Sequence, residues 1–240
     1  MSQTSSVIVA LDFPSERETM QLVDQLEPSL CRLKVGKELF TRCGPELVKR
    51  LVDKNFDVFL DLKFHDIPNT VAHACVAAAD LGVWMLNVHA LGGEKMMLAA
   101  KQALDGRYPL AKHSPLLIAV TWLTSSGQAE LDALGIKASP QEMVYRLATM
   151  TRNAGLDGVV CSAQEVPVLR QNLGDDFLLV TPGIRLADSQ LTGSQPDDQC
   201  RVVTPEKAIA DGASYLVIGR PITQAKDPCK VLRTIIREIG

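Results

Sequence analysis

Short apolar runs rich in β-branched residues recur about every 25 to 35 residues along the chain. The eight runs are Val7–Leu11, Leu33–Val35, Val58–Leu62, Trp84–Val88, Leu116–Val120, Gly158–Cys161, Leu178–Thr181 and Tyr215–Ile218. Between them lie segments with apolar residues at helical spacing, among them 39–52, 71–81, 143–154 and 231–239. The pattern predicts a strand followed by a helix, repeated eight times.

The predicted strands are apolar almost throughout, which is typical of a parallel sheet with both faces covered. Eight strand and helix units within 240 residues favour closure into a (β/α)8 TIM barrel, an α/β fold that would occupy residues 1–240 as one domain. An open doubly wound sheet is the alternative. No G-x-G-x-x-G sequence follows the first run, where a dinucleotide-binding fold would carry it, so we expect the barrel.

Two stretches interrupt the repeat, 124–140 after the fifth run and 186–201 after the seventh. Both follow the carboxyl ends of predicted strands, and in a barrel these ends form the catalytic face. Long loops on this face commonly act as lids or ligand clamps, although tolerated insertions are the alternative for each stretch.

Charged residues lie within or directly after the first three runs. Residues 60–70 read LDLKFHDIPNT, and two positions of a strand that are two residues apart project from the same face. Asp61 and Lys63 should therefore point together into the barrel, where opposite charges offset the cost of burial. With Lys34 in the second run, Asp12 after the first and Asp66 in the following loop, they predict a charge network. A buried salt-bridge layer that only sets the barrel register is the alternative.

A phosphate site is predicted beyond the seventh and eighth runs. Gly219 lets the backbone approach a ligand, Arg220 offers a planar donor fork, and Pro221 suits the first turn of a helix. Residues 181–185 read TPGIR, and Gly183 again permits a close backbone approach. Loops at these two places commonly bind phosphate in barrels, whereas an ordinary capped helix with an exposed arginine is the alternative.

Composition narrows the classes of partner. A net charge of −3 provides no overall attraction to nucleic acid or to anionic membranes. The sequence contains neither a signal peptide nor an apolar run of about 18 residues, so we expect a soluble, cytoplasmic protein.

Six scattered cysteines and four histidines lack metal-ligand spacing, which predicts reduced thiols and no metal site. We expect His89, which follows the fourth run, to pack or hydrogen-bond rather than to catalyse.

Taken with these motifs, the chain resembles the orotidine 5′-phosphate decarboxylase family from end to end. The resemblance is carried by D-x-K-x-x-D-I at 61–67, RLKVG at 32–36, TPGIR at 181–185 and IGRP at 218–221. Sugar-phosphate lyases of the same barrel superfamily share the first motif alone, so the set is more specific than any of its members.

The resemblance implies decarboxylation of orotidine 5′-phosphate to uridine 5′-phosphate, a step of de novo pyrimidine biosynthesis, by a homodimer without a cofactor. It implies that Lys63 protonates C6, that Asp61 and Lys34 complete the charge network, and that Asp66 and Thr70 reach the neighbouring subunit's active site. The substrate-binding residues that it implies are Asp12 at the ribose, Thr121 at the pyrimidine edge, Gln199, Gly219 and Arg220 at the phosphate, and Pro182 and Arg185 nearby.

The chemistry explains why such residues are needed. Loss of carbon dioxide from C6 leaves an sp2 carbanion that no adjacent carbonyl delocalises, so its stabilisation must be electrostatic. The Lys63 ammonium would supply that stabilisation and the proton, with carboxylates of Asp61 and Asp66 keeping it charged. Whether Asp61 also destabilises the substrate carboxylate stays open.

Two other functions compete with decarboxylation of the nucleotide. A magnesium-dependent aldolase or decarboxylase acting on a sugar phosphate needs an acidic ligand on the second strand, where this chain has Lys34. A catalytically silent barrel that binds a nucleotide as a sensor would have no need of Asp61, Lys63 and Asp66 together.

Overall fold

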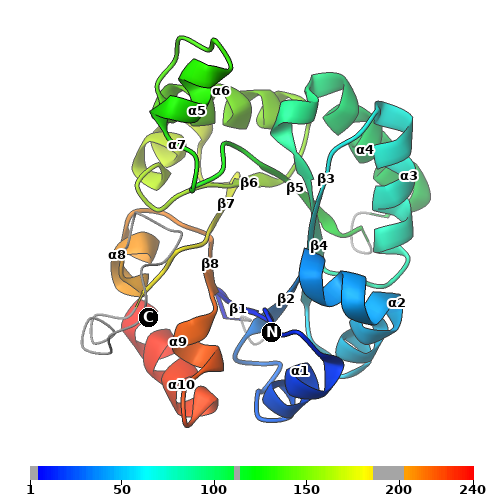
Figure 1. Cartoon of the computed structure of the whole chain (residues 1–240), viewed down its shortest axis with the longest axis vertical. Coiled ribbons are helices and arrows are strands. Elements are labelled where there is room, and N and C mark those ends of the chain that lie inside the picture. The colour runs from blue at the N-terminus through cyan, green and yellow to red at the C-terminus, as the bar shows by residue number, and fades with distance from the viewer. Residues whose placement is uncertain (1–4, 111–113, 186–202) are drawn as a thin grey trace.

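Eight parallel strands form a closed barrel in which each strand pairs with its sequence neighbour and β8 returns to β1 (Figure 1). The computed structural model describes residues 5–110, 114–185 and 203–240. The strands are β1 Val7–Ala10, β2 Arg32–Gly36, β3 Val58–Phe64, β4 Met85–His89, β5 Leu116–Val120, β6 Gly158–Val160, β7 Leu178–Thr181 and β8 Tyr215–Ile218. The predicted TIM barrel is confirmed, and pairing of β1 with β8 excludes the open sheet.

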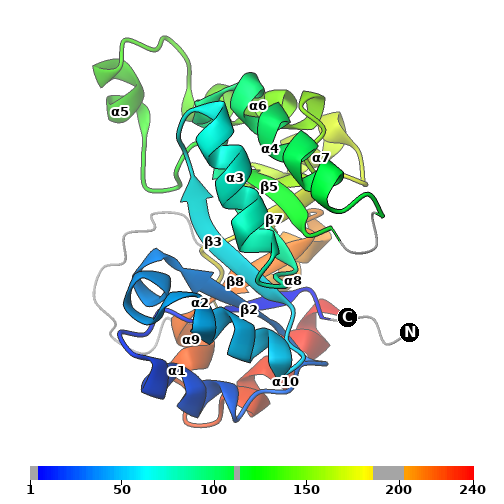
Figure 2. The ribbon, with the colours of Figure 1, turned by 90° about the vertical axis from the view of Figure 1, so that its right-hand side faces the viewer.

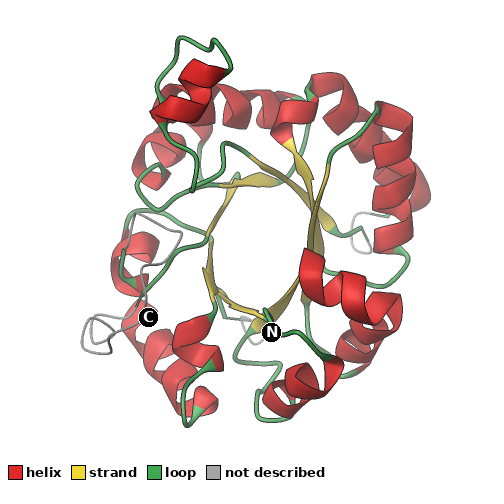
Figure 3. Ribbon diagram, viewed as in Figure 1, coloured by secondary structure: helices red, strands yellow, loops and turns green. Residues whose placement is uncertain are grey.

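Helices surround the strands as an outer ring (Figure 3). They are α1 Glu16–Val23, α2 Lys37–Asp53, α3 Pro68–Ala79, the short 3-10 helix η1 Ala90–Gly92, α4 Glu94–Arg107, α5 Gln128–Ala133, α6 Pro140–Asn153, α7 Val166–Leu173, α8 Pro205–Ala210, α9 Arg220–Thr223 and α10 Pro228–Ile239. Within the described residues, no helix is long and apolar enough to cross a membrane.

Helix starts lie two or three residues earlier than the apolar periodicity predicts. The side chains of Ser139 and Asp227 accept hydrogen bonds from backbone N–H groups of the first turns of α6 and α10, and a proline occupies each first turn. Capping chemistry sets these boundaries, and it carries no apolar signal.

The 124–140 stretch holds α5, which stands away from the barrel in Figure 2. The whole 186–201 stretch lies outside the described residues.

Two cores explain why the strands are apolar on both faces. On β1, Val7 and Val9 pack outward against the helices, whereas Ile8 and Ala10 belong to a separate cluster inside the barrel. Alternate residues of each strand therefore meet different neighbours, but both sets are apolar.

The amino end of the barrel is filled around a buried arginine. The Arg32 guanidinium carbon lies 4.3 Å from the ring centre of Trp84 and 5.0 Å from that of Tyr215. Its Nε lies 3.2 Å from Oδ2 of Asp57. Stacking and ion pairing offset the cost of burying this charge. A ligand must therefore enter at the opposite end, where the strands finish.

Candidate active site

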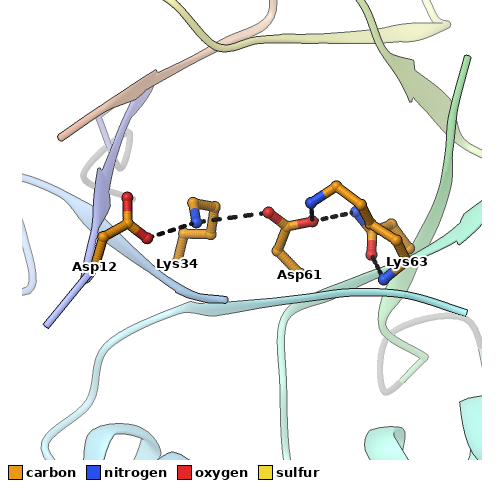
Figure 4. A network of polar contacts seen from close by, with 5 residues as sticks. Asp12, Lys34, Asp61 and Lys63 are labelled. Atoms are coloured by element: carbon orange, nitrogen blue, oxygen red, sulfur yellow. Dashed lines mark hydrogen bonds and ion pairs between the residues drawn. The ribbon is translucent and has the colours of Figure 1, made fainter. Parts of the chain in front are cut away.

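A row of alternating charges runs across the carboxyl ends of the first three strands (Figure 4). Lys34 Nζ lies 3.3 Å from Asp12 Oδ1 and 3.5 Å from Asp61 Oδ2, and Lys63 Nζ lies 2.6 Å from Asp61 Oδ1. Asp12 follows β1, Lys34 belongs to β2, and the last two residues belong to β3. Parallel neighbours bring these side chains to one edge, so the predicted clustering of the four residues is confirmed.

Exposure differs along this charge row. The side chains of Lys34 and Asp61 are only 11% and 12% exposed, whereas those of Asp12 and Lys63 are 69% and 28% exposed. The buried pair is thus flanked by one cation and one anion that open to the mouth of the barrel. A ligand at the mouth can contact Lys63 and Asp12, while Lys34 and Asp61 hold them from below.

Asp61 is the electrostatic centre of the row. Burial by itself would raise the pKa of its carboxyl, but the ammonium groups of Lys34 and Lys63, with hydrogen bonds from Lys63 and Asn87, lower that pKa below its ordinary value. Asp61 is therefore ionised at neutral pH in spite of its burial.

The backbone at Lys63 departs from the regular strand that the sequence predicts. Leu60 pairs with Leu86 and Phe64 pairs with Val88, so β3 advances four residues while β4 advances two. Within this bulge Lys63 adopts a φ of 54°, in the left-handed region that residues with a side chain seldom enter. The predicted meeting of Asp61 and Lys63 is confirmed, but strand alternation is the wrong reason for it.

Asn87, on β4, is a site residue that the sequence analysis missed. It is fully buried, its Oδ1 accepts a 2.7 Å hydrogen bond from the Lys63 backbone N–H, and its Nδ2 donates a 2.7 Å hydrogen bond to Asp61 Oδ1. The available signal was an amide side chain in the otherwise apolar sequence Met85-Leu-Asn-Val, at a position facing the barrel interior.

The predicted phosphate end adjoins the same edge. Arg220 begins α9 as an exposed residue and Pro221 lies in its first turn, as the sequence predicts. A methyl group on Gly219 would lie 3.9 Å from Asp12 Oδ2, so this segment runs beside the exposed end of the charge row. After β7, Gly183 has a φ of 81°, a conformation that suits glycine.

Three further predicted substrate residues lie near this end or beyond the described chain. Pro182 and Arg185 are partly buried, and the Arg185 N–H donates to the carbonyl of Val203 at 3.2 Å. Gln199 lies outside the described residues. No group of three or more His, Cys, Asp or Glu side chains that could hold a metal occurs in the described parts of the chain.

Comparison with known proteins identifies the family. Residues 5–235 match the family described as orotidine 5′-phosphate decarboxylase / HUMPS. An orotidine 5′-phosphate decarboxylase of Nitrosococcus oceani is 60% identical over 240 residues, covering 99% of each chain. The enzyme of that name from Haemophilus influenzae is 60% identical over 237 residues, covering 99% of this chain and 100% of its own.

The chain belongs to the orotidine 5′-phosphate decarboxylase / HUMPS family. A crystal structure of orotidine 5′-phosphate decarboxylase from Lactobacillus acidophilus superposes with a TM-score of 0.86 at 40% identity, covering 98% of this chain and 99% of that one. The resemblance inferred from the motifs is confirmed, and with it the expectation of a decarboxylase of pyrimidine biosynthesis.

The two residues that the resemblance assigns to the neighbouring subunit's site stand apart from the charge row. Asp66 is exposed and its Oδ1 accepts a 2.6 Å hydrogen bond from the N–H of Ile67, while Thr70 is exposed in the first turn of α3. Among the described residues, Asp61 is the carboxylate that pairs with Lys63. Within one chain the row therefore has four members, and the expectation of a fifth, Asp66, holds only if it reaches another subunit.

Thr121 and His89 also lie at the carboxyl ends of strands, directly after β5 and at the end of β4. Thr121, which follows β5, is fully buried, and its hydroxyl donates a hydrogen bond to the carbonyl of Val160 at 2.9 Å. Because its proton is used in this bond, the hydroxyl would accept a hydrogen bond from a ligand.

The rings of His65 and His89 stack with centroids 5.4 Å apart. Burial, followed by the charges of His65, Lys37 and Lys63, lowers the pKa of His89 to about 4. His89 is accordingly neutral at pH 7.

Proposed function

We propose that this chain converts orotidine 5′-phosphate to uridine 5′-phosphate and carbon dioxide without a metal or an organic cofactor. The observation that carries the proposal is the Asp12, Lys34, Asp61 and Lys63 row, which presents one ammonium to the barrel mouth above an ionised carboxylate. Lys34 occupies the strand position at which a sugar-phosphate lyase of this superfamily would need an acidic metal ligand, so the nucleotide is the better substrate.

The reaction requires one bond to break and one to form. The bond between C6 and the carboxylate carbon breaks, its electron pair stays on C6, and carbon dioxide leaves. The Lys63 Nζ then transfers a proton to C6, which yields the uridine ring, and the neutral amine regains a proton from water. Because the carbanion concentrates charge on one atom, a fixed ammonium stabilises it more than it stabilises the delocalised substrate carboxylate.

The rest of the row holds that ammonium in place. Lys63 is 28% exposed and bonded to Asp61, which is itself bonded to Lys34 from the other side. Three charges thus restrain one another before substrate arrives, and a preorganised site needs little rearrangement during reaction. Asp12 stands at the open end of the row, where it can accept hydrogen bonds from the ribose hydroxyls.

Phosphate binding is assigned to the segments after β7 and β8. Arg220 supplies a guanidinium and Gly219 an open backbone approach, and Pro182, Arg185 and Gln199 complete this set. The phosphate is remote from the bond that breaks, so its binding energy would act through ordering of loops and charges.

A symmetric homodimer would complete each site. The exposed segment 65–70 carries Asp66 and Thr70, and Ile67 between them is 67% exposed. Leu91 and Leu98, on the neighbouring rim and on α4, are 40% and 42% exposed. Exposed apolar side chains beside a site favour an interface, and a two-fold axis would bring each Asp66 to the partner's Lys63.

The deciding experiment measures both products. Purified protein is incubated with orotidine 5′-phosphate labelled in the carboxyl group, and released carbon dioxide and uridine 5′-phosphate are quantified. We expect one of each per substrate consumed. Absence of both products at high enzyme concentration, or turnover of a pentulose or hexulose phosphate instead, would contradict the proposal.

A further inference from the structure

The bulge in β3 creates a problem that the barrel must solve. Lys63 takes no part in the ladder between β3 and β4, because pairing passes from Leu60 directly to Phe64. Its N–H therefore loses the carbonyl partner that a regular strand would provide, and a buried N–H without an acceptor is costly. Its φ of 54° is also one that a residue with a side chain adopts only when its surroundings impose it.

One side chain supplies what the bulge lacks. Asn87 Oδ1 accepts from the Lys63 N–H at 2.7 Å, and Asn87 Nδ2 donates to Asp61 Oδ1 at 2.7 Å. The same Asp61 oxygen receives the Lys63 ammonium at 2.6 Å. The amide thus joins the backbone of Lys63 to the carboxylate that binds its side chain, and it is fully buried.

We propose that Asn87 is a positioning residue for the decarboxylation: it imposes the backbone conformation of Lys63 and thereby directs the ammonium at the reacting carbon. The inference rests on the proposed function, since that reaction defines where the ammonium must point. The hydrogen bonds printed for the Asn87 side chain go to Lys63 and Asp61, so it would act through these two residues.

Few other side chains fit this position. Leucine has a similar size but lacks both the donor and the acceptor. Aspartate keeps an acceptor for the Lys63 N–H but places a second carboxylate against Asp61 in place of the amide donor. The variants Asn87→Leu and Asn87→Asp therefore separate loss of both hydrogen bonds from loss of the Asp61 hydrogen bond.

The control must remove a buried hydrogen bond elsewhere. Thr151, on α6, is fully buried, and its hydroxyl donates to the carbonyl of Leu147 at 2.8 Å. Thr151→Val abolishes that bond without approaching the charge row. Each variant is compared with wild type for thermal unfolding, kcat and KM at a temperature where all are folded.

We expect Asn87→Leu to lower kcat about 10- to 100-fold while KM changes less than about threefold, because misplacement of the ammonium affects the reaction and not the phosphate contacts. Loss of the amide donor also removes one cause of the low pKa of Asp61, which Lys34 and Lys63 otherwise flank. The acid limb of kcat against pH should therefore move to higher pH. Thr151→Val should lower thermal stability and leave both readouts unchanged.

A second readout does not depend on turnover. Amide hydrogen exchange at Lys63 should be faster in Asn87→Leu than its global loss of stability accounts for, and near wild type in Asn87→Asp, which keeps the acceptor. If the wild-type protein has no decarboxylase activity, the proposed function is contradicted. The exchange measurement would still test whether Asn87 holds the backbone of Lys63. Unchanged kcat and exchange in Asn87→Leu, or failure of both Asn87 variants to fold at low temperature, would overturn the positioning role.

Discussion

The ammonium of Lys63 lies 2.6 Å from the carboxylate of Asp61, although the two residues are separated by a single position on β3. The contact coincides with the bulge in which Lys63 has a φ of 54°. A pair within one strand is set by the barrel itself and does not wait for a loop to close. Within one chain this ion pair therefore forms without a bound ligand.

Replacement of this ammonium should stop the reaction. We expect Lys63→Ala to abolish turnover, because it removes both the stabilising charge and the proton donor. The fold should persist, since Asp61 keeps its ion pair with Lys34. Steady-state kinetics and thermal unfolding test this, with Lys49→Ala at a 48% exposed surface lysine as the control. Retention of more than a few per cent of wild-type kcat would rule the role out.

Arg220 should affect binding more than chemistry. We expect Arg220→Ala to lower kcat/KM, but by several orders of magnitude less than Lys63→Ala, because a phosphate ligand acts on binding and closure. Guanidinium added to the assay should restore part of the loss. Arg146→Ala, at a 59% exposed arginine of α6, is the control. A variant that handles the phosphorylated substrate as wild type does would exclude Arg220 as a ligand.

Activity should not depend on a metal. The proposed reaction draws its charge stabilisation from Lys63, so exhaustive dialysis against EDTA should leave kcat unchanged. The enzyme is assayed before dialysis, after dialysis, and after addition of magnesium or zinc. Loss of activity on dialysis, followed by recovery with either metal, would contradict this prediction.

Subunit mixing tests the role of Asp66. Inactive Lys63→Ala protein is mixed with inactive Asp66→Ala protein under conditions that allow exchange. A heterodimer would contain one site with both defects and one with intact Lys63 and the partner's intact Asp66. Activity should rise to about half of wild type per heterodimer, or roughly a quarter for the mixture with random pairing. Confirmed exchange with no gain in activity would show that Asp66 serves its own chain.

Burial of His89, together with the neighbouring charges of His65, Lys37 and Lys63, should make the fold sensitive to acid. The pKa of His89 is about 4 in the folded protein, below the value of about 6.5 expected when unfolded. The unfolded chain binds a proton first, so the stability contribution is complete above about pH 6.5 and is lost as pH falls toward 4. After discounting for partial exposure, the loss is on the order of 1–2 kcal/mol.

Urea unfolding at pH 7 and pH 4.5 measures this effect. His89→Gln should lose less free energy of unfolding between the two values than wild type loses. The control is His73→Gln, which removes an exposed histidine of α3 without touching the stack. Equal losses in wild type and His89→Gln would contradict the assignment.

Local sequence determined the elements and the edge on which the chemistry lies. Strands such as β5 and β7 coincide with their apolar runs. A strand that is buried on both faces is apolar at every position, so the run marks its bounds directly. Asp12, Lys34 and Asp61 could be placed together because successive parallel strands finish at one edge. Helix starts were less accurate, since the start of α6 depends on the hydrogen bond that Ser139 accepts and on the fixed φ of Pro140, and not on hydrophobicity.

Tertiary structure alone decided how these groups are held. The left-handed conformation of Lys63 arises from a register change between β3 and β4, and register is a property of two strands together. The sequence gives Asn87 no partner, and β3 supplies one only in the folded barrel; likewise, only the fold shows that the rings of Trp84 and Tyr215 lie against Arg32. The sequence determines which side chains are available. Whether a buried polar group finds a hydrogen-bond partner, and so avoids the free-energy cost of burial without one, depends on the neighbours that the fold places beside it.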